Sequence, residues 1–304
     1  MDNFVLFCKT YAGDFDRARF LVESIDKHNM DNIPLYFSVP AADLDLFRNG
    51  IKSDNLILVT DEEISENLYR SNTEKFSKGY LNQQIIKLTF WKLGVCNHYF
   101  ALDSDSYFIR DFYLNDFLFD EETPYVNLFQ WEDHFLDTDF IQWVGIYKNN
   151  INTINAHIGL ETSKCMTCPG FTTLSVKVLE SFENEFLIKK GWDYQKLMDV
   201  CPFEFSWYNQ WLIKCGLQRI MPVTGFFKVF HYKKLYKESR KKLVKEADIA
   251  SMFLGIIMQS NWKPFPPPIK YKDPAWYHYS NYYLEKFFTR AYYKIRKILS
   301  GKNR

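Results

Sequence analysis

The sequence has no excess of charge of either sign. Its 304 residues include 38 Lys and Arg against 37 Asp and Glu, which leaves a formal net charge of +1. Proteins that bind nucleic acid over a large surface carry a clear basic excess, because they must neutralise the phosphate backbone. The composition therefore predicts that nucleic acid is not a partner.

Long apolar runs are missing at the N-terminus. The chain begins MDNFVLFCKTYAGDFDR, with an acidic second residue and only a short apolar stretch. A signal peptide needs a basic start and a longer apolar core, and a membrane-spanning helix needs about 20 apolar residues. We expect a protein that stays in the cytosol.

Cysteine is sparse, and the spacing of zinc sites is absent. The six cysteines are scattered, and CMTC at 165–168 is the only pair of cysteines separated by two residues. No second such pair and no HxxxH lies at the spacing that zinc sites use. The pattern predicts ordinary reduced thiols.

Apolar and aromatic residues, in contrast, are abundant. Hydrophobic residues make up 47% of the chain, and Phe, Tyr and Trp make up 18%. This is enough to fill the core of one large α/β domain with an appendage, or of two small domains. Aromatic rings serve core packing and also stack on sugar or base rings.

Strands and helices alternate over the first 110 residues. Short apolar runs predict strands at 4–10, 33–40 and 55–60, and helical spacing of apolar residues predicts helices over 14–29 and 80–95. The alternation predicts an α/β fold with a Rossmann-like, mostly parallel sheet and helices on both faces. In such sheets, ligands bind at the carboxyl ends of the strands.

The second half of the chain is less regular. Apolar spacing favours helices over 173–191 and 204–216. The segment 219–232 is typical of a strand pair or of one strand with a bulge, and 253–262 of a last strand.

Two aspartates end a buried run of the sequence FALDSDSYFIRDF. Asp103 and Asp105, with Ser104 between them, stand where an apolar strand reaches the surface. Side chains two apart on a strand point to one face, so the two carboxylates are expected to converge. Converging carboxylates repel each other unless a cation lies between them, and Mg²⁺ or Mn²⁺ suits oxygen ligands. The pattern predicts a divalent metal site, although acidic pairs at strand ends more often cap turns.

Five segments resemble, in order and spacing, a family of bacterial glycosyltransferases of the GT-A fold with a DxD motif. The resemblance spans roughly residues 4–232, and its most specific parts are the QQxxK helix and the DSD. It implies that Asp103 and Asp105 hold a metal ion that clamps the diphosphate of a nucleotide sugar. The segments are CKTYAGDFDRARFLVESI, GYLNQQIIKL, ALDSDSYFIRDF, CPGFTTLSVKVL and EFSWYNQWL.

The resemblance also implies which residues hold the sugar donor. Thr10, Tyr11 and Asp14 fall where such enzymes hold the nucleobase and the ribose, although Asp14 is equally well placed to cap the next helix. Gln84 and Lys87 lie one helical turn apart and are expected to reach the donor phosphates. For Lys87 the alternative is a solvated helix surface.

Further residues are candidates for metal binding and for proton transfer. His231 ends a late expected strand, and many GT-A enzymes supply a third metal ligand from such a histidine, although a lone histidine is more often a packed core residue. Glu204 could deprotonate the acceptor hydroxyl, or it could only complement a helix dipole. Asp133 and Asp137 are weaker alternatives on an expected acceptor loop.

A proline-rich run separates the catalytic body from a tail. KPFPPPIKYKDP can form neither a helix nor a central strand. We therefore expect a glycosyltransferase domain over 1–262, with a nucleotide-binding half (1–112) and an acceptor half (113–262), followed by a connector and a helical tail over 263–304.

The tail combines an apolar stripe at helical spacing with basic residues. It is expected either to pack on the core or to bind an anionic membrane surface, which would place the protein at the inner face of the plasma membrane. The basic residues that follow Glu285, with no further acidic one, are Lys286, Arg290, Lys294, Arg296, Lys297, Lys302 and Arg304.

The expected function is a metal-dependent transfer of a sugar to a hydroxyl of a bacterial surface glycan or lipid-linked acceptor. The cofactor is Mn²⁺ or Mg²⁺, and the donor is taken to be a UDP-sugar, the commonest donor for DxD enzymes of this fold. Whether the transfer inverts or retains the anomeric configuration stays open. The alternatives are a Mg²⁺-dependent sugar nucleotidyltransferase, although KTYAGDFDR has only one glycine where a glycine-rich loop is usual, and a non-catalytic glycan-binding protein.

Overall fold

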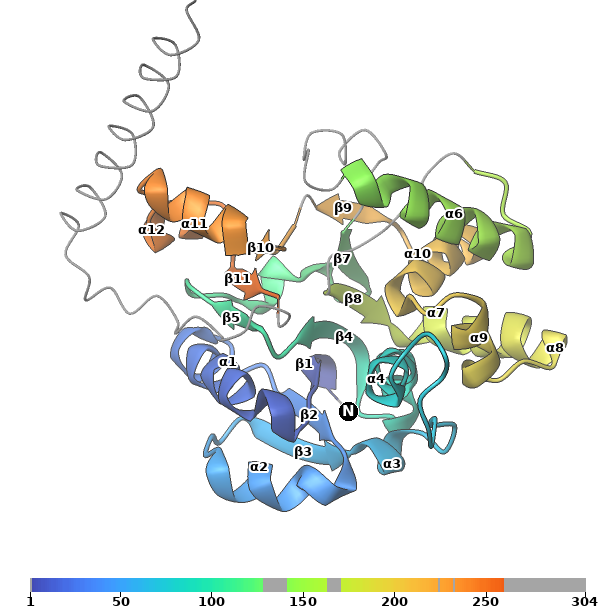
Figure 1. Ribbon diagram of the computed structural model, residues 1–304, viewed down its shortest axis with the longest axis horizontal. Helices are drawn as coiled ribbons and strands as arrows, with labels where there is room; N and C mark the ends of the chain where they lie inside the picture. The colour runs from blue at the N-terminus through green and yellow to red at the C-terminus, as the bar shows by residue number, and fades with distance from the viewer. Residues whose placement is uncertain (1, 128–140, 163–170, 224, 232, 260–304) are drawn as a thin grey trace, which may run out of the picture.

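The structure is a computed structural model that describes residues 2–127, 141–162, 171–223, 225–231 and 233–259. A five-stranded sheet lies at its centre, and two three-stranded sheets are formed farther along the chain (Figure 1). No helix within these ranges is long and apolar enough to cross a membrane.

The central sheet has the strand order β3-β2-β1-β4-β8. The first four strands are parallel, and β8 runs antiparallel to β4. The order 3-2-1-4 is that of a doubly wound sheet, which confirms the predicted α/β fold with a mostly parallel sheet. The strands are β1 (Asp2–Lys9), β2 (Leu35–Val39), β3 (Leu56–Thr60), β4 (Cys96–Asp103) and β8 (Thr172–Ser175).

Helices cover both faces of this sheet, as predicted (Figure 1). Side chains alternate between the faces along a strand, so Val5 and Phe7 belong to one apolar core while Leu6 and Cys8 belong to the other. The core of Val5 and Phe7 includes residues of α4 (Lys78–Thr89), α7 (Val176–Ser181) and α10 (Glu204–Cys215), and that of Leu6 and Cys8 includes residues of α1 (Phe15–His28) and α2 (Leu44–Gly50).

Local signals set the bounds of α4, the helix that leads into the site. The Ser77 hydroxyl accepts a hydrogen bond from the backbone N–H of Tyr80 at 3.3 Å, which caps the first turn. After Thr89 the chain tightens into a 3₁₀ turn, η3 (Phe90–Leu93), and Gly94 ends it at φ 65°. Glycine suits this left-handed conformation because it has no Cβ, and β4 can therefore begin at Cys96.

The aspartate pair does not lie on one strand, which corrects the prediction. β4 ends at Asp103, Ser104 and Asp105 form a turn, and β5 (Ser106–Phe108) begins directly afterwards. The Ser106 hydroxyl donates to the Asp103 carbonyl at 2.5 Å and closes this turn. The two carboxylates were predicted to converge because side chains two apart on a strand point to one face. Asp105 is not on the strand, so this argument does not apply to it.

The segment 173–191 was predicted as one helix, and this too is corrected. It begins inside β8, whose four residues are all buried, and turns helical only at Val176. The β-branched residues Thr172 and Thr173 suit a pleated strand, and β8 adds to the edge of the sheet by pairing with β4. The remaining helical turns of this segment are η5 (Phe182–Leu187) and α8 (Ile188–Lys190).

Two smaller sheets lie beside the central one. One has the order β10-β11-β5 and the other β6-β7-β9. The segment 219–232 does form two strands, β9 (Met221–Val223) and β10 (Phe227–Phe230), but they belong to different sheets and do not pair with each other. The other strands are β6 (Leu118–Asp120), β7 (Thr123–Asn127) and β11 (Gly255–Met258).

The other helical elements lie on the connections. They are η1 (Ala12–Asp14), η2 (Ala41–Asp43), α3 (Asp61–Ile64), η4 (Leu114–Asp116), α6 (Ile141–Ile158), α9 (Tyr194–Val200), α11 (Lys233–Lys241) and α12 (Glu246–Ala250).

Candidate active site

The candidate site lies at the carboxyl ends of β1 and β4. After β1 the chain builds β2 and β3 on one side, and it then returns to place β4 on the other side of β1. Lys9 at the end of β1 is in register with Asp103 at the end of β4. Such a switch in strand order leaves a crevice at the carboxyl edge of the sheet, where α/β proteins bind their ligands.

A buried lysine joins two carboxylates at this edge. The Nζ atom of Lys87 lies 2.7 Å from Oδ1 of Asp103 and 3.0 Å from Oε1 of Glu204. Lys87 is only 1% exposed, and the Phe205 ring lies 4.8 Å from its ammonium group. The three charged residues come from α4, β4 and α10, so one ion-pair cluster connects the two halves of the chain.

Burial and charge act in opposite directions on this cluster. Burial favours the neutral form of Lys87, but the Asp103 and Glu204 carboxylates outweigh it and raise the pKa of the ammonium group above its usual value. Burial also raises the pKa of Glu204, and Lys87 offsets part of that rise. Lys87 therefore stays charged, and its charge is balanced inside the protein.

Asp103 is the part of the cluster that reaches the surface. Its side chain is 27% exposed. The amide Nε2 of Gln83 donates to Asp103 Oδ1 at 2.7 Å, so two donors hold the same carboxylate oxygen. The carboxylate is thus fixed in orientation and still accessible from outside.

Gln83, which sequence analysis did not single out, is the glutamine that contacts Asp103, and the donor contact predicted for Gln84 stays a prediction. Gln84, which was predicted to face the donor, is 5% exposed, and its amide lies against the Glu204 carboxylate. Gln83 lies four residues before Lys87 and therefore shares its helix face. That spacing was the signal that could have identified Gln83.

A second buried ion pair lies at the ends of β1, β2 and β3. Lys9 Nζ lies 2.9 Å from Asp61 Oδ2, and the Ser38 hydroxyl donates to Asp61 Oδ1 at 2.5 Å. Burial raises the pKa of Asp61, and Lys9 opposes the rise. Lys9 also donates to the Thr10 carbonyl at 2.6 Å, so the pair fixes the backbone where β1 ends. Sequence analysis did not identify Lys9, Ser38 or Asp61.

The three residues expected to hold the nucleoside follow β1. Thr10 is 2% exposed, and within the described parts of the chain its hydroxyl has no hydrogen-bond partner. Tyr11 is 52% exposed, and its ring lies so close to Gly13 that a Cβ there would be 2.4 Å from the ring. Asp14 stands at the N-cap position of α1, but its side chain pairs with Arg17 and makes no capping hydrogen bond. Their nucleoside contacts stay predictions.

The structure does not assemble the predicted set of three metal ligands. Among the described residues, no three His, Cys, Asp or Glu side chains lie close enough together to hold a metal, so His231 does not join the two aspartates. His231 follows β10, where burial, with a smaller effect from Lys228, lowers its pKa to about 3. Ser104 and Asp105 are 6% and 8% exposed.

Two carboxylates are nevertheless a sufficient protein contribution for one kind of metal site. Mg²⁺ commonly binds one or two carboxylates and takes its other ligands from substrate phosphates and water. The exposed carboxylate of Asp103 fits that donor set, Asp105 lies 8% exposed on the turn that follows β4, and the metal site stays a prediction.

Some candidates cannot be placed. Asp133, Asp137, the CMTC segment and the predicted tail over 263–304 lie outside the described residues. The proposed division into a nucleotide-binding half and an acceptor half is not tested by the site.

Comparison with known proteins gives the chain a family match but no function. Residues 4–139 match a family of unknown function, DUF6492. No curated protein matches the chain. Among solved structures, the apo form of mouse xyloside xylosyltransferase 1 is similar at a TM-score of 0.49 and 10% identity, over 87% of this chain and 100% of that chain. This likeness is too distant to transfer an activity or a residue role.

Proposed function

We propose that this protein is a metal-dependent glycosyltransferase that moves a sugar from a nucleotide-diphosphate sugar, taken to be a UDP-sugar, to a hydroxyl of a surface glycan or lipid-linked acceptor. One observation carries the proposal. Asp103, oriented by two donors yet 27% exposed, stands at the carboxyl end of β4 beside the end of β1. The resemblance of the QQxxK and DSD segments to GT-A glycosyltransferases supports the same reaction class.

The residues of the chain would act mainly by orientation. Gln83 and Lys87 hold one oxygen of Asp103, so its other oxygen keeps a constant direction. An ion held by Asp103 and Asp105 would stabilise the negative charge that develops on the leaving diphosphate. Preorganised groups of this kind are effective because they need no rearrangement during the reaction.

The environment of Glu204 favours a supporting role over that of a general base. A base must come within hydrogen-bond distance of the acceptor hydroxyl. Glu204 is 6% exposed, and its Oε1 is already 3.0 Å from Lys87. We therefore propose that Glu204 balances the charge of Lys87, so that Lys87 does not neutralise Asp103 alone.

The proposed donor site follows the end of β1. The exposed ring of Tyr11 offers a surface on which a nucleobase can stack, and Gly13 leaves room for that ring.

Calorimetric titration of UDP with and without Mn²⁺ tests this function. We expect UDP to bind the wild type only with Mn²⁺, and D103N to lose this binding while it remains folded, because Glu204 still pairs with Lys87. D116N is the matched control, because Asp116 lies on the separate turn η4. UDP binding that needs no metal, or that survives in D103N, contradicts the proposal. Incubation with a nucleoside triphosphate and a sugar phosphate separates a transferase from a nucleotidyltransferase, which would release pyrophosphate.

A further inference from the structure

A small cavity lies beside the N-terminal half of α4, away from the charged cluster. Its volume is about 260 Å³. Leu81 and Met198, which are 2% and 1% exposed, make its apolar floor. The rest of the lining is Thr73, Glu74, Lys75, Phe76 and Asp199.

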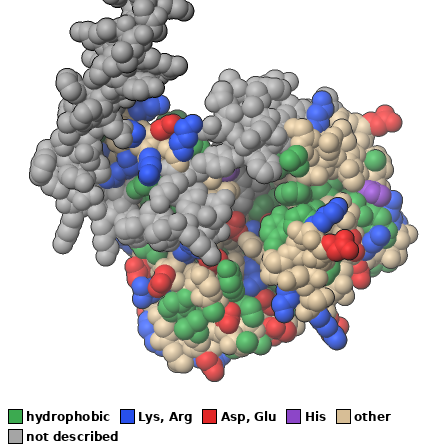
Figure 2. Space-filling model, in the orientation of Figure 1, with side chains coloured by type: hydrophobic (Ala, Val, Ile, Leu, Met, Phe, Trp, Pro, Cys, Tyr) green, Lys and Arg blue, Asp and Glu red, His purple; other side chains and the backbone are tan. Residues whose placement is uncertain are grey.

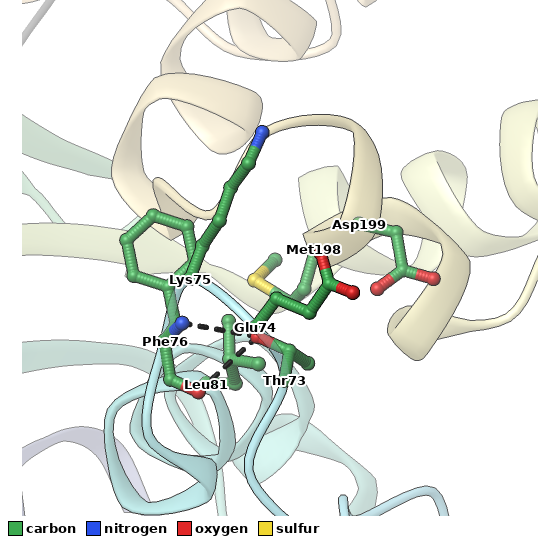
Figure 3. A pocket seen from close by; sticks show the side chains of 7 residues that line it. All are labelled: Thr73, Glu74, Lys75, Phe76, Leu81, Met198 and Asp199. Carbon is green, nitrogen blue, oxygen red and sulfur yellow. Dashed lines mark hydrogen bonds between the residues drawn. The ribbon is translucent and has the colours of Figure 1, made fainter.

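Polar and aromatic groups face each other across this cavity. Figure 3 shows the Phe76 ring on one side and the carboxylates of Glu74 and Asp199 on the other, with Met198 between them. An aromatic ring opposite carboxylates suits a sugar, whose ring has an apolar face and whose hydroxyls donate to carboxylate oxygens. Glu74 and Asp199 outnumber Lys75 in the lining, and this negative balance disfavours the phosphate groups of a nucleotide.

The walls of the cavity are held in place by a network of hydrogen bonds. The Thr73 backbone N–H donates to the Phe76 carbonyl at 3.0 Å, and the Phe76 N–H donates to the Thr73 hydroxyl at 3.0 Å. The Tyr69 hydroxyl lies 2.7 Å from the Gln195 carbonyl and 2.8 Å from Asp199 Oδ1, so its one proton is shared between these two acceptors. These bonds order the backbone of residues 73–76 in advance, which lowers the conformational entropy lost when a ligand binds.

The cavity is connected to the candidate active site through α4 and Tyr80. Leu81 and Lys87 are six residues apart on α4, which is about 9 Å along the helix axis. The Phe76 ring stacks on Tyr80 at 5.4 Å, and the Tyr80 hydroxyl donates at 3.1 Å to the carbonyl of Pro202, two residues before Glu204. A short oligosaccharide can cover that span.

We propose that this cavity is a binding subsite for one sugar ring of the acceptor glycan, with Phe76 against the apolar face of the ring and Glu74 and Asp199 accepting from its hydroxyls. That the bound sugar belongs to the acceptor rests on the proposed transferase function. That the cavity binds a sugar does not. The cavity is smaller than the roughly 300–1,000 Å³ of sites for larger ligands, so it takes a single ring.

Methyl NMR of protein labelled at methionine tests the subsite directly. Met198 lies in the cavity, and Met252, which is 74% exposed, serves as an internal control. The probes are the methyl glycosides of glucose, galactose, mannose, N-acetylglucosamine and rhamnose, titrated through the millimolar range. We expect at least one of them to shift the Met198 signal with saturation while Met252 stays unchanged, and F76A to weaken that affinity at least tenfold.

The matched control variant is F119A, because Phe119 is another exposed phenylalanine, 46% accessible, on β6. It should bind sugar like the wild type. The proposal is overturned if none of the glycosides shifts Met198, if Met252 shifts equally, or if F76A binds like the wild type. If Met198 reports a sugar while UDP with Mn²⁺ does not bind, the subsite is supported and the transferase function is contradicted, so the two failures are distinguishable.

Discussion

Lys87 carries a positive charge at a position that water does not reach. A buried ammonium group is tolerated only when partners balance it, and Asp103 and Glu204 do so at 2.7 and 3.0 Å. Because α10 supplies one partner and β4 the other, this side chain links the strand that carries the site to the second half of the chain.

Removing the charge of Lys87 should destabilise the fold. In K87M two carboxylates would remain close together without their cation, and breaking such a buried pair typically costs about 3–5 kcal/mol. Urea unfolding measures the change in the free energy of unfolding. K92M is the control, because Lys92 pairs with Glu183 but its side chain is 35% exposed, and such surface pairs contribute about 0–1 kcal/mol. If the free energy of unfolding falls equally in K87M and K92M, the buried cluster around Lys87 contributes no more to stability than a surface pair, and the prediction is wrong.

The substitution E204Q separates the two roles considered for Glu204. The glutamine keeps the shape of the side chain but leaves Asp103 as the only anion beside Lys87. We expect both Mn²⁺-dependent UDP binding and sugar transfer to fall, because Asp103 is then neutralised by Lys87. Calorimetry and a transfer assay on the same sample measure the two effects. Loss of transfer with unchanged UDP binding would instead restore the role of general base.

At the scale of elements, β4 combines a buried start with a partly exposed end. His98 near its start is 3% exposed, whereas the Asp103 side chain at its end is 27% exposed. Burial, with a smaller effect from the charge of Lys177, lowers the pKa of His98 to about 4. The histidine is therefore neutral in the folded protein over the range in which it would take up a proton in the unfolded chain.

This difference predicts a loss of stability in acid. The unfolded chain binds a proton at His98 below about pH 6.5 and the folded protein only below about pH 4. The free energy of unfolding should therefore fall as the pH drops through this window, by about 3 kcal/mol once it is crossed. Denaturant unfolding of the wild type and H98Q between pH 4 and 8 measures it. Below pH 6.5 the free energy of unfolding of H98Q should depend less on pH than that of the wild type, and above pH 7 the two should depend on pH equally. Parallel curves over the whole range would contradict the assignment of this pH dependence to His98.

At the scale of the whole molecule, acidic and basic residues are nearly balanced, with 38 Lys and Arg against 37 Asp and Glu. On the one face drawn in Figure 2, acidic and basic side chains of the described residues are interspersed, and basic ones gather over α11. In the sequence this helix precedes the basic residues predicted for the tail, which itself lies outside the described ranges.

The tail is predicted to bind anionic membranes. Each basic residue near an anionic leaflet contributes about 1 kcal/mol before screening by salt, so the full chain should sediment with vesicles rich in anionic lipid at low salt and be released at high salt. Truncation after Pro274 should abolish this binding. The control is K234Q/K237Q, which removes two exposed charges of α11 and leaves the tail intact. If the full chain does not sediment at low salt, or if the truncated chain still does, the prediction is wrong.

The sequence by itself determined the alternation of strands and helices in the first half, and with it the α/β class. Apolar runs and apolar spacing are local properties, so the continuous apolar run of β1 and the helical spacing of Leu81 and Ile85 in α4 indicated burial from the sequence alone. The position of Asp103 at the carboxyl edge followed from the same pattern, because parallel strands end at one edge of a sheet.

Only the tertiary structure decided which charged groups meet at that edge. Lys87 and Glu204 are 117 residues apart in the sequence, and their contact depends on how α10 packs against α4. Likewise, Asp105 lies on a turn and not on β4, because the chain turns there into β5. That strand pairs with β11, which comes from the far end of the described chain. Periodicity describes one segment at a time, whereas a buried ion pair or a change of sheet depends on partners distant in sequence, and packing alone brings those partners together.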